Sequence, residues 1–404
     1  MTSRRKTTLP VTGEVLRWAR EYAGITFNAA AQALKMERLD LAALEAEERQ
    51  PTLGELNALA TAYGVSVSVL LLPSPPGPLE LPTDYRTVGG VTAAPTPETV
   101  RAIREAQQLQ AFISELAQDN PEIVPMASLP QITTAEDAEQ VATAERQRFD
   151  VPLEAQLHWR MREVFGKWRS RTQTAGLLVL IKRMPREDCR GFSLRGEGLV
   201  PAIVVNSNDV EQAKAFTLFH EYGHLLLSDE GLCLRAEDNS DRGRVEKWCN
   251  EFAAAFLVPE LDLRQYVSGK FSVTNATYSW TTNEIRRIAN RYKVSRPAVA
   301  LRLQKLELAP PNFYDLNRTL LNWSEQRPER SQDRPIKGIT HPPGWREKQK
   351  LEEIGVSAAE AILEAWKSQV TDATDAADAL GLSLDELFGL EDRVLVERTR
   401  NIGL

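Results

Sequence analysis

The sequence has little of what would mark an exported or membrane-bound protein. No apolar run approaches the roughly 18 residues that a membrane span needs. The basic residues near Met1 are not followed by the apolar stretch of a secretory signal. The three cysteines, Cys189, Cys233 and Cys249, cannot all pair with one another. We therefore expect a cytoplasmic protein with reduced thiols and no membrane contact.

Histidine is also scarce, and no sign of charge dominates. The chain has 4 histidines and a net charge of -7 over 404 residues. This balance disfavours a protein that coats nucleic acid over its whole surface, but it allows a local basic patch. Since 42% of the residues are hydrophobic and 26% are charged, the chain can build several domains, each with a core.

Proline-rich breaks divide the chain. The segment Pro73-Ser-Pro-Pro-Gly-Pro78 cannot be helical and is typical of a stiff linker, and a second break mixes Arg, Pro, Ser and Gln. We predict an α+β protein that is mainly helical. Its predicted parts are a helix-turn-helix bundle (1–72), a linker (73–96), a central domain with a small sheet (97–270), a basic helical domain (271–323), a second linker (324–345) and a C-terminal helical domain (346–404).

The N-terminal segment predicts short helices with short turns. Thr52 and Glu55 form a capping-box pattern, and Gly64 marks a helix end. The order LEAEERQPTLGELNALATAYGVSVSVLL resembles the second half of Cro/repressor-type DNA-binding domains. The presumed recognition helix is acidic, however, so dimerisation or partner docking stays open beside DNA binding. The predicted helices are Glu14–Tyr22, Phe27–Leu34, Arg38–Glu47, Leu53–Tyr63 and Val67–Leu71.

Strand-like segments precede a long helix in the central domain. The predicted strands are Leu177–Lys182, Arg190–Leu194 and Pro201–Asn206, and the helix runs from Asp209 to Leu227. This helix contains the sequence FHEYGH, an HExxH motif.

The spacing of that motif predicts a metal site. His220 and His224 are one helical turn apart, so both imidazoles leave the same face and can share one ion. Glu221 can reach a water held by that ion and take its proton, as the general base of a peptidase does. We expect Zn²⁺, and the ligand set also admits Mn²⁺.

A zinc site needs a third protein ligand, and the next predicted helix offers candidates. Within EKWCNEFAAAFLVP, Glu246 shares a face with Asn250, whereas Glu251 lies on another face. Cys249 and Cys233 can also bind zinc, although Cys249 fits a buried helix-packing position better. Glu246 is the favoured third ligand, and the others stay open.

These segments together resemble the ImmA/IrrE family of metallopeptidases. The resemblance rests on AFTLFHEYGHLLL, on EKWCNEFAAAFLVP and on the preceding RGFS and PAIVVNS, and it covers residues 177–308. It implies that Glu246 is the third ligand. It also implies a gluzincin-like domain that cleaves DNA-bound repressors, with an extended substrate adding to the strand over 202–206.

A second helix-turn-helix pattern follows, in TTNEIRRIANRYKVSRPAVALRLQKLEL. Ser295 is the expected N-cap, with Pro297 in the first turn. The segment resembles the small helical domain that follows the peptidase in the same family. Its basic face makes it the best nucleic-acid candidate in the chain, with a solvated supporting face as the alternative. The candidate contacts are Arg286, Arg287, Arg291, Lys293, Arg296 and Arg302, with Lys305 adding to the charge.

The C-terminal segment over 351–396 has helical patterning. In VTDATDAADALGLSLDELFGL, Ser383 and Glu386 form a capping box, and the surface is rich in aspartate. An acidic surface disfavours DNA contact, so we expect it to bind a partner.

Two functions from different classes fit these features. The first is a zinc endopeptidase that cleaves or controls a repressor or partner protein in stress, mobile-element or toxin-antitoxin regulation. The second is an antitoxin or transcriptional regulator whose zincin domain is a scaffold for a toxin, such as a PIN-like ribonuclease. A homodimer is compatible with both. A third reading, a DNA regulator only, predicts that mutation of Glu221 changes nothing.

Overall fold

The computed structural model describes residues 8–63, 65, 67–75, 95–227, 239–273, 275–322 and 342–402. The chain divides into two compact units, Met1–Pro82 with Gly89–Glu105 and Thr83–Val88 with Ala106–Leu404. We call these the N-terminal unit and the large unit. The division falls inside helix α6 (Pro97–Asp119). The predicted domain boundaries remain predictions, and most of both predicted linkers lies outside the described residues.

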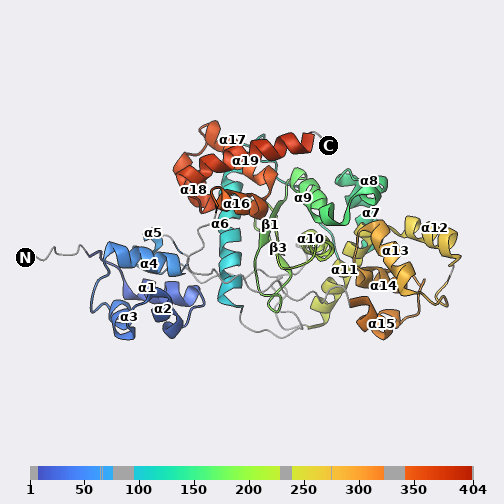
Figure 1. Cartoon of the computed structure of the whole chain (residues 1–404), viewed down its shortest axis with the longest axis horizontal. Coiled ribbons are helices and arrows are strands. Elements are labelled where there is room, and N and C mark those ends of the chain that lie inside the picture. The colour runs from blue at the N-terminus through green and yellow to red at the C-terminus, as the bar shows by residue number, and fades with distance from the viewer. Residues whose placement is uncertain are drawn as a thin grey trace, which may run out of the picture. The chain divides into compact units, whose positions relative to one another are not determined.

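The N-terminal unit is a bundle of short helices around one apolar core (Figure 1). Helix α2 caps on Thr26 and ends at Lys35, which has the left-handed conformation that closes the turn into α3. The predicted capping box is present, since Thr52 and Glu55 exchange hydrogen bonds. The predicted helix-turn-helix is therefore confirmed. Its helices are α1 (Gly13–Tyr22), α2 (Phe27–Leu34), α3 (Arg38–Glu45), α4 (Leu53–Tyr63) and α5 (Val67–Leu70).

Some of the acidic charge in this unit is neutralised internally. Glu45 of α3 is buried and accepts hydrogen bonds from Arg20 at 2.6 and 3.1 Å. Glu47 accepts from the backbone of Gly13, and Glu55 accepts from Arg49. The number of Asp and Glu residues in the sequence therefore overstates the unpaired negative charge near α3, since Glu45 and Glu55 are paired with arginines.

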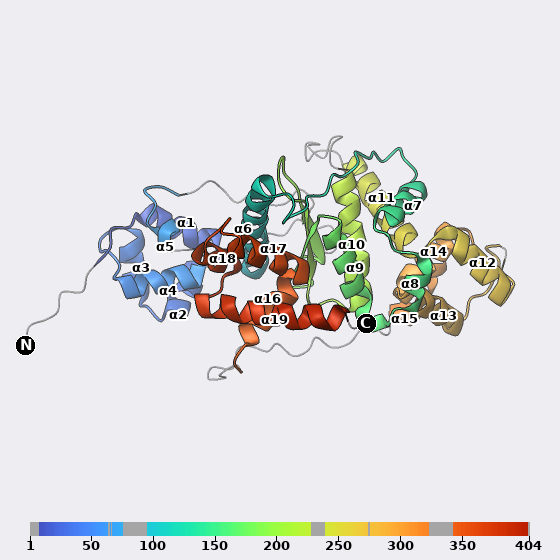
Figure 2. The same cartoon turned by 90° about the horizontal axis from the view of Figure 1, so that it is seen from above.

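The large unit is mainly helical around a three-stranded sheet, as predicted (Figures 1 and 2). Its helices before the sheet are α7 (Ala138–Arg148), α8 (Leu153–His158), a short 3-10 turn (Met161–Glu163) and α9 (Val164–Thr174). After the sheet come α10 (Glu211–Leu226), α11 (Asn239–Leu257), α12 (Glu260–Phe271), α13 (Thr282–Tyr292), α14 (Arg296–Lys305) and α15 (Phe313–Asn322). The C-terminal helices are α16 (Trp345–Ile354), α17 (Val356–Lys367), α18 (Ala373–Leu380) and α19 (Leu384–Ile402).

The strand order corrects one prediction. The sheet has the order β1 (Leu178–Lys182), β3 (Ala202–Asn206), β2 (Gly191–Leu194), with β1 parallel and β2 antiparallel to β3. Because β3 is paired on both sides, a substrate cannot add to it as a strand, and the expectation for residues 202–206 is wrong. Within the described part of the chain, β2 pairs only with β3 and forms an edge next to α10.

One apolar core joins the helices on both sides of α10 and α11. It contains Trp168 of α9, Phe219 of α10 and Phe256 of α11, whose rings contact one another. The predicted second helix-turn-helix is also present as α13 and α14, capped by Thr281 and Ser295. Its buried residues belong to this same core, so the basic segment packs as part of the large unit.

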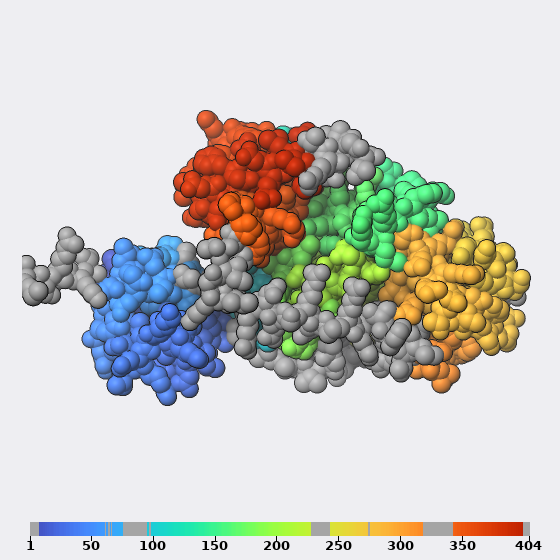
Figure 3. Space-filling view, viewed as in Figure 1, coloured from blue at the N-terminus to red at the C-terminus, as the bar shows by residue number. Residues whose placement is uncertain are grey.

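The C-terminal helices, orange and red in Figure 3, lie against the green central part of this unit. They contact β1 and α9, partly through buried polar groups. Arg169 of α9 donates hydrogen bonds to the carbonyls of Glu352 and Glu353, at the end of α16. Gln173 donates to the carbonyl of Ile354. Burial lowers the pKa of Arg169 to about 9, so its guanidinium stays charged at neutral pH. The end of α16 is thus capped by side chains of α9.

A side-chain ion pair joins the same two parts. Lys182, at the end of β1, bonds to Glu353 of α16, and Lys350 lies 3.1 Å from the same carboxylate. Burial opposes the charged form of Glu353, but the two lysines outweigh it and hold its pKa below the usual range. A carboxyl with a lowered pKa stabilises the fold above its unfolded pKa, and this contribution is lost as the pH falls through the folded value.

We therefore expect Glu353→Gln to lower the melting temperature of the full chain at pH 7. Below about pH 4.3, the unfolded pKa of Glu, the difference from wild type should begin to shrink, because the unfolded wild-type chain then takes up a proton at Glu353. The difference should vanish below the folded pKa, where the carboxyl is protonated in both states. Glu352→Gln is a matched control, since the side chain of Glu352 is exposed. A difference between wild type and Glu353→Gln that stays constant from pH 7 to pH 3 would contradict this account.

No described helix is long and apolar enough to cross a membrane.

Candidate metal centre

The HExxH helix lies in the interior of the large unit. Helix α10 contacts β2 and β3 on one side and α11 on another (Figure 1). Its apolar residues, including Phe219 and Tyr222, are fully buried, so packing fixes the helix on most of its surface. His220 and His224 are 9% and 3% exposed, which gives them a nearly dry environment at the boundary with α11.

Helix α11 brings a carboxylate to the two imidazoles. The Nε2 atoms of His220 and His224 lie 3.2 Å apart. The carboxylate oxygens of Glu246 lie 3.7 Å from His220 Nε2 and 3.8 Å from His224 Nε2. Donor atoms held about 2.1 Å from one tetrahedral ion are about 3.4 Å apart. The three side chains therefore fit one metal ion, and no other described group of His, Cys, Asp and Glu has such a geometry.

Asn250 orients one of these imidazoles. Its Oδ1 lies 3.0 Å from Nδ1 of His220. An amide oxygen can only accept, so this contact places the His220 proton on Nδ1 and leaves Nε2 as the metal-facing lone pair. From its spacing in the sequence, Asn250 was expected on the same face as Glu246, with no predicted role. The signal was available, because a residue four positions after a ligand projects toward the same site.

Glu221 lies between the two histidines in sequence and close to strand β2. It is 6% exposed. A Cβ placed on Gly191 of β2 would come within 3.5 Å of Glu221 Cγ and within 2.7 Å of the Val204 carbonyl. Glycine at this position lets the edge strand approach α10, so the backbone of β2 borders the site. Sequence reasoning did not identify Gly191.

Small residues also set the spacing of α10 and α11. A Cβ on Gly223 would meet Cys249 Sγ at 3.2 Å and Cys249 Cα at 3.3 Å. The two helices thus cross closely next to His224, which brings Glu246 within reach of the histidines. Cys249 is fully buried, as expected for a helix-packing residue.

Of the remaining alternative third ligands, Glu251 lies elsewhere and Cys233 lies outside the described residues, and His158, His341 and Cys189 were not predicted as ligands. Glu251 pairs with Lys305 at 2.8 Å and is not part of the metal cluster. His158 is exposed and contacts the carbonyl of Glu154. Cys233 and His341 lie outside the described residues. Cys189 is buried near Glu221, and burial, together with nearby carboxylates, raises its pKa to about 12, so its thiol stays protonated.

The structure separates the predicted nucleic-acid contacts into two groups. Arg302 is 2% exposed and bonds to Glu139 and to the Val258 carbonyl, so its inclusion among surface contacts was wrong. The sequence could not show this, because its partners lie on α7 and at the end of α11. Arg291 bonds to Asp262, and Lys293 to backbone carbonyls. The residues that remain at the surface are Arg286 and Arg287, which are exposed, and Arg296, which is half-buried.

The fold and site together define a helix-turn-helix protein with a metallopeptidase-like centre. Family models that match the sequence support the same two assignments. Residues 172–304 match the model of the IrrE N-terminal-like domain, a peptidase family, and residues 12–71 match that of a helix-turn-helix domain. A search of curated proteins found no match. The chain therefore carries an IrrE/ImmA-like protease domain behind a domain typical of DNA-binding regulators.

Proposed function

We propose that this chain is a zinc-dependent endopeptidase that acts on a protein, with His220, His224 and Glu246 as metal ligands. The proposal is carried by the convergence of two imidazoles and one carboxylate from α10 and α11. Three protein ligands leave a fourth position for water or substrate, as in catalytic zinc sites. A zinc ion held by these residues would supply Lewis-acid chemistry, which activates a water and a scissile carbonyl for hydrolysis.

Glu221 acts on protons in this proposal. It lies on α10 with both histidines and is 6% exposed. In the proposed reaction its carboxylate would take a proton from the attacking water and give it to the departing amine. The edge of β2 next to Glu221 supports an extended substrate, whose backbone can pair with that strand and lie along the site.

The helix-turn-helix domain connects this activity to gene regulation. We propose that the protein cleaved or controlled is a repressor or another regulatory partner, in stress, mobile-element or toxin-antitoxin regulation. The two domains in one chain support this assignment. The scaffold alternative, in which the same domain docks a toxin, predicts that the site residues can be changed without effect on regulation.

The metal ligands are tested by replacing Glu246 and its neighbour. We expect dialysed wild-type protein to hold about one metal ion per chain by elemental analysis. Glu246→Gln should lose most of it, whereas Glu251→Gln, on the same helix, should keep it. Growth with both zinc and manganese supplied identifies the metal, and we expect zinc. Metal retained by Glu246→Gln but lost by Glu251→Gln would reverse the assignment of the third ligand.

A further inference from the structure

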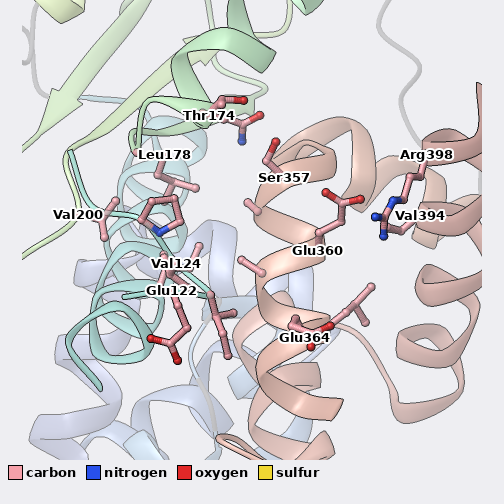
Figure 4. Close-up of a pocket in the computed structure, with 18 of the residues that line it drawn as sticks. Glu122, Val124, Thr174, Leu178, Val200, Ser357, Glu360, Glu364, Val394 and Arg398 are labelled. Atoms are coloured by element: carbon pink, nitrogen blue, oxygen red, sulfur yellow. The ribbon is translucent and has the colours of Figure 1, made fainter. Parts of the chain in front are cut away.

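A second recess lies away from the metal centre in the large unit. It is a cavity of about 640 Å³ between the C-terminal helices and the core (Figure 4). Leu178 of β1, Val200 and Val124 line one side, and Leu363 of α17 and Val394 of α19 line the other. The metal ligands do not line it. The cavity is therefore separate from the candidate metal centre, and its lining is mixed, with apolar side chains on both sides.

The rim of this cavity is acidic. Glu122, Glu360 and Glu364 carry carboxylates around these apolar side chains, as Figure 4 shows. A fourth carboxylate, Glu391, pairs with Lys367 at 2.7 Å, which removes that lysine as a counterion for the others. Arg398 is the remaining base in the lining. A ligand with positive charge is favoured at such a rim.

Exposed apolar side chains continue from the cavity along α19. Leu395 lines the cavity, and Phe388 and Leu384 follow on the same helical face, seven and eleven positions earlier. These side chains are 51%, 50% and 45% exposed. Eleven residues of helix span about 16 Å. Trp366 of α17 contacts the Phe388 ring at 5.4 Å and widens this stripe. Glu391 and Asp392 lie between Phe388 and Leu395 along α19, so the stripe is apolar at both ends and flanked by carboxylates in between. Exposed apolar side chains grouped in this way are typical of an interaction site rather than of scattered exposure.

Exposed carboxylates are frequent on α18 and on α19 itself. Residues 371–392 contain no lysine or arginine. Of their acidic residues, Asp372, Asp375, Asp378, Asp385 and Asp392 are exposed. The cavity and the stripe thus form one surface with an apolar centre and acidic margins. We call this surface, with Leu178, Glu360, Glu364, Leu384, Phe388 and Leu395 as its markers, the α17/α19 groove.

We propose that the α17/α19 groove binds a basic amphipathic helix of a partner protein. The apolar side chains of such a helix would fill the cavity and cover the stripe, as in other helix-in-groove complexes. Its lysine and arginine residues would meet the acidic margins, which gives specificity and fast association. The stripe extends the apolar surface well beyond the cavity, farther than a small molecule bound in the cavity would cover.

A second copy of the chain fits this groove less well. The stripe from Leu384 to Leu395 is centred near Gly389, so a twofold pairing of two α19 helices would bring Glu391 and Asp392 near their own symmetry mates. Like charges placed together oppose such pairing. The proposal is independent of the metal centre, since none of its residues lies there.

The test uses the full chain and a synthetic amphipathic helix with leucine on one face and lysine on the other. Its matched control carries glutamate in place of lysine. Binding is measured by fluorescence anisotropy at low and at 0.3 M salt. The groove variant is Glu360→Lys with Glu364→Lys. The control variant, Glu197→Lys with Asp315→Lys, changes the net charge equally at exposed positions outside the groove.

We expect wild type and the control variant to bind the lysine peptide equally, and the groove variant to bind at least tenfold more weakly. Leu384→Asp should also weaken binding, because it interrupts the apolar stripe at an exposed position, and metal content should stay unchanged in every variant. Binding should weaken at 0.3 M salt. Equal binding by all variants, binding of the glutamate peptide, or no binding of the lysine peptide at low salt would overturn the proposal. A wild-type dimer that dissociates in the groove variant would overturn it in favour of a second copy.

Discussion

Glu221→Gln is expected to hold as much metal as wild type and to cleave its protein substrate at least about a hundredfold more slowly. A general base contributes about 10² to 10⁴ in rate, and glutamine cannot take the proton. The side chain keeps its size, so the packing of α10 should persist. Metal content is measured by elemental analysis, and cleavage is followed on proteins encoded beside this one, with intact protein and fragments resolved by mass.

The matched control is Glu211→Gln, at the start of the same helix and in contact with Lys214 rather than with the site. This variant should cleave like wild type. Undiminished cleavage by Glu221→Gln would exclude Glu221 as the base. If metal is bound, no neighbour is cut, and wild type and Glu221→Gln bind a toxin-like partner equally, the scaffold function replaces the peptidase.

Trp168→Ala should destabilise the large unit by about 3–5 kcal/mol, the usual cost of removing a buried aromatic ring. Trp168 is fully buried. Its ring centroid lies 4.9, 5.0 and 5.3 Å from those of Trp159, Phe219 and Phe256. It thus joins α9 to the two helices that carry the candidate metal ligands. The change is measured by urea unfolding followed by circular dichroism, and metal content should fall with stability.

Trp168→Phe separates ring packing from hydrogen bonding. Within the described residues, the buried indole Nε1 has no hydrogen-bond partner, so its removal leaves no acceptor unsatisfied. We expect phenylalanine to retain much of the packing and to cost less than alanine, since it leaves a smaller cavity. Equal losses of stability in Trp168→Phe and Trp168→Ala would show that a phenyl ring at this position does not retain the packing of the indole.

Local features of this protein could be predicted from its sequence. The strand predictions over 177–182 and 201–206 each begin one residue early, and the helices Phe27–Leu34 and Leu53–Tyr63 match the structure. Caps at Thr52 and Ser383 were also found. These features depend on side-chain periodicity and on contacts three or four residues apart, both of which are present in the sequence itself.

The central position of β3 depends on contacts between distant segments. The continuous run of apolar residues in AIVVN shows that both faces of the strand are covered, but it does not show a central position, because the edge strand β1, LVLIK, is equally apolar. The burial of Arg302 had no comparable signal, since its partner Glu139 lies more than 160 positions earlier. The α17/α19 groove likewise requires the placement of β1 against the C-terminal helices, which no local pattern encodes.

The capping of α16 by Arg169 and Gln173 has a consequence for how this protein can change over time. These side chains bond to the main-chain carbonyls of residues 352–354, and every amino acid supplies such a carbonyl. Apart from the Glu353 side chain, the attachment therefore depends on the backbone conformation of residues 352–354 and not on their side chains. The C-terminal helices can change in sequence, and so acquire new recognition surfaces, while α9 keeps the same two residues to hold them.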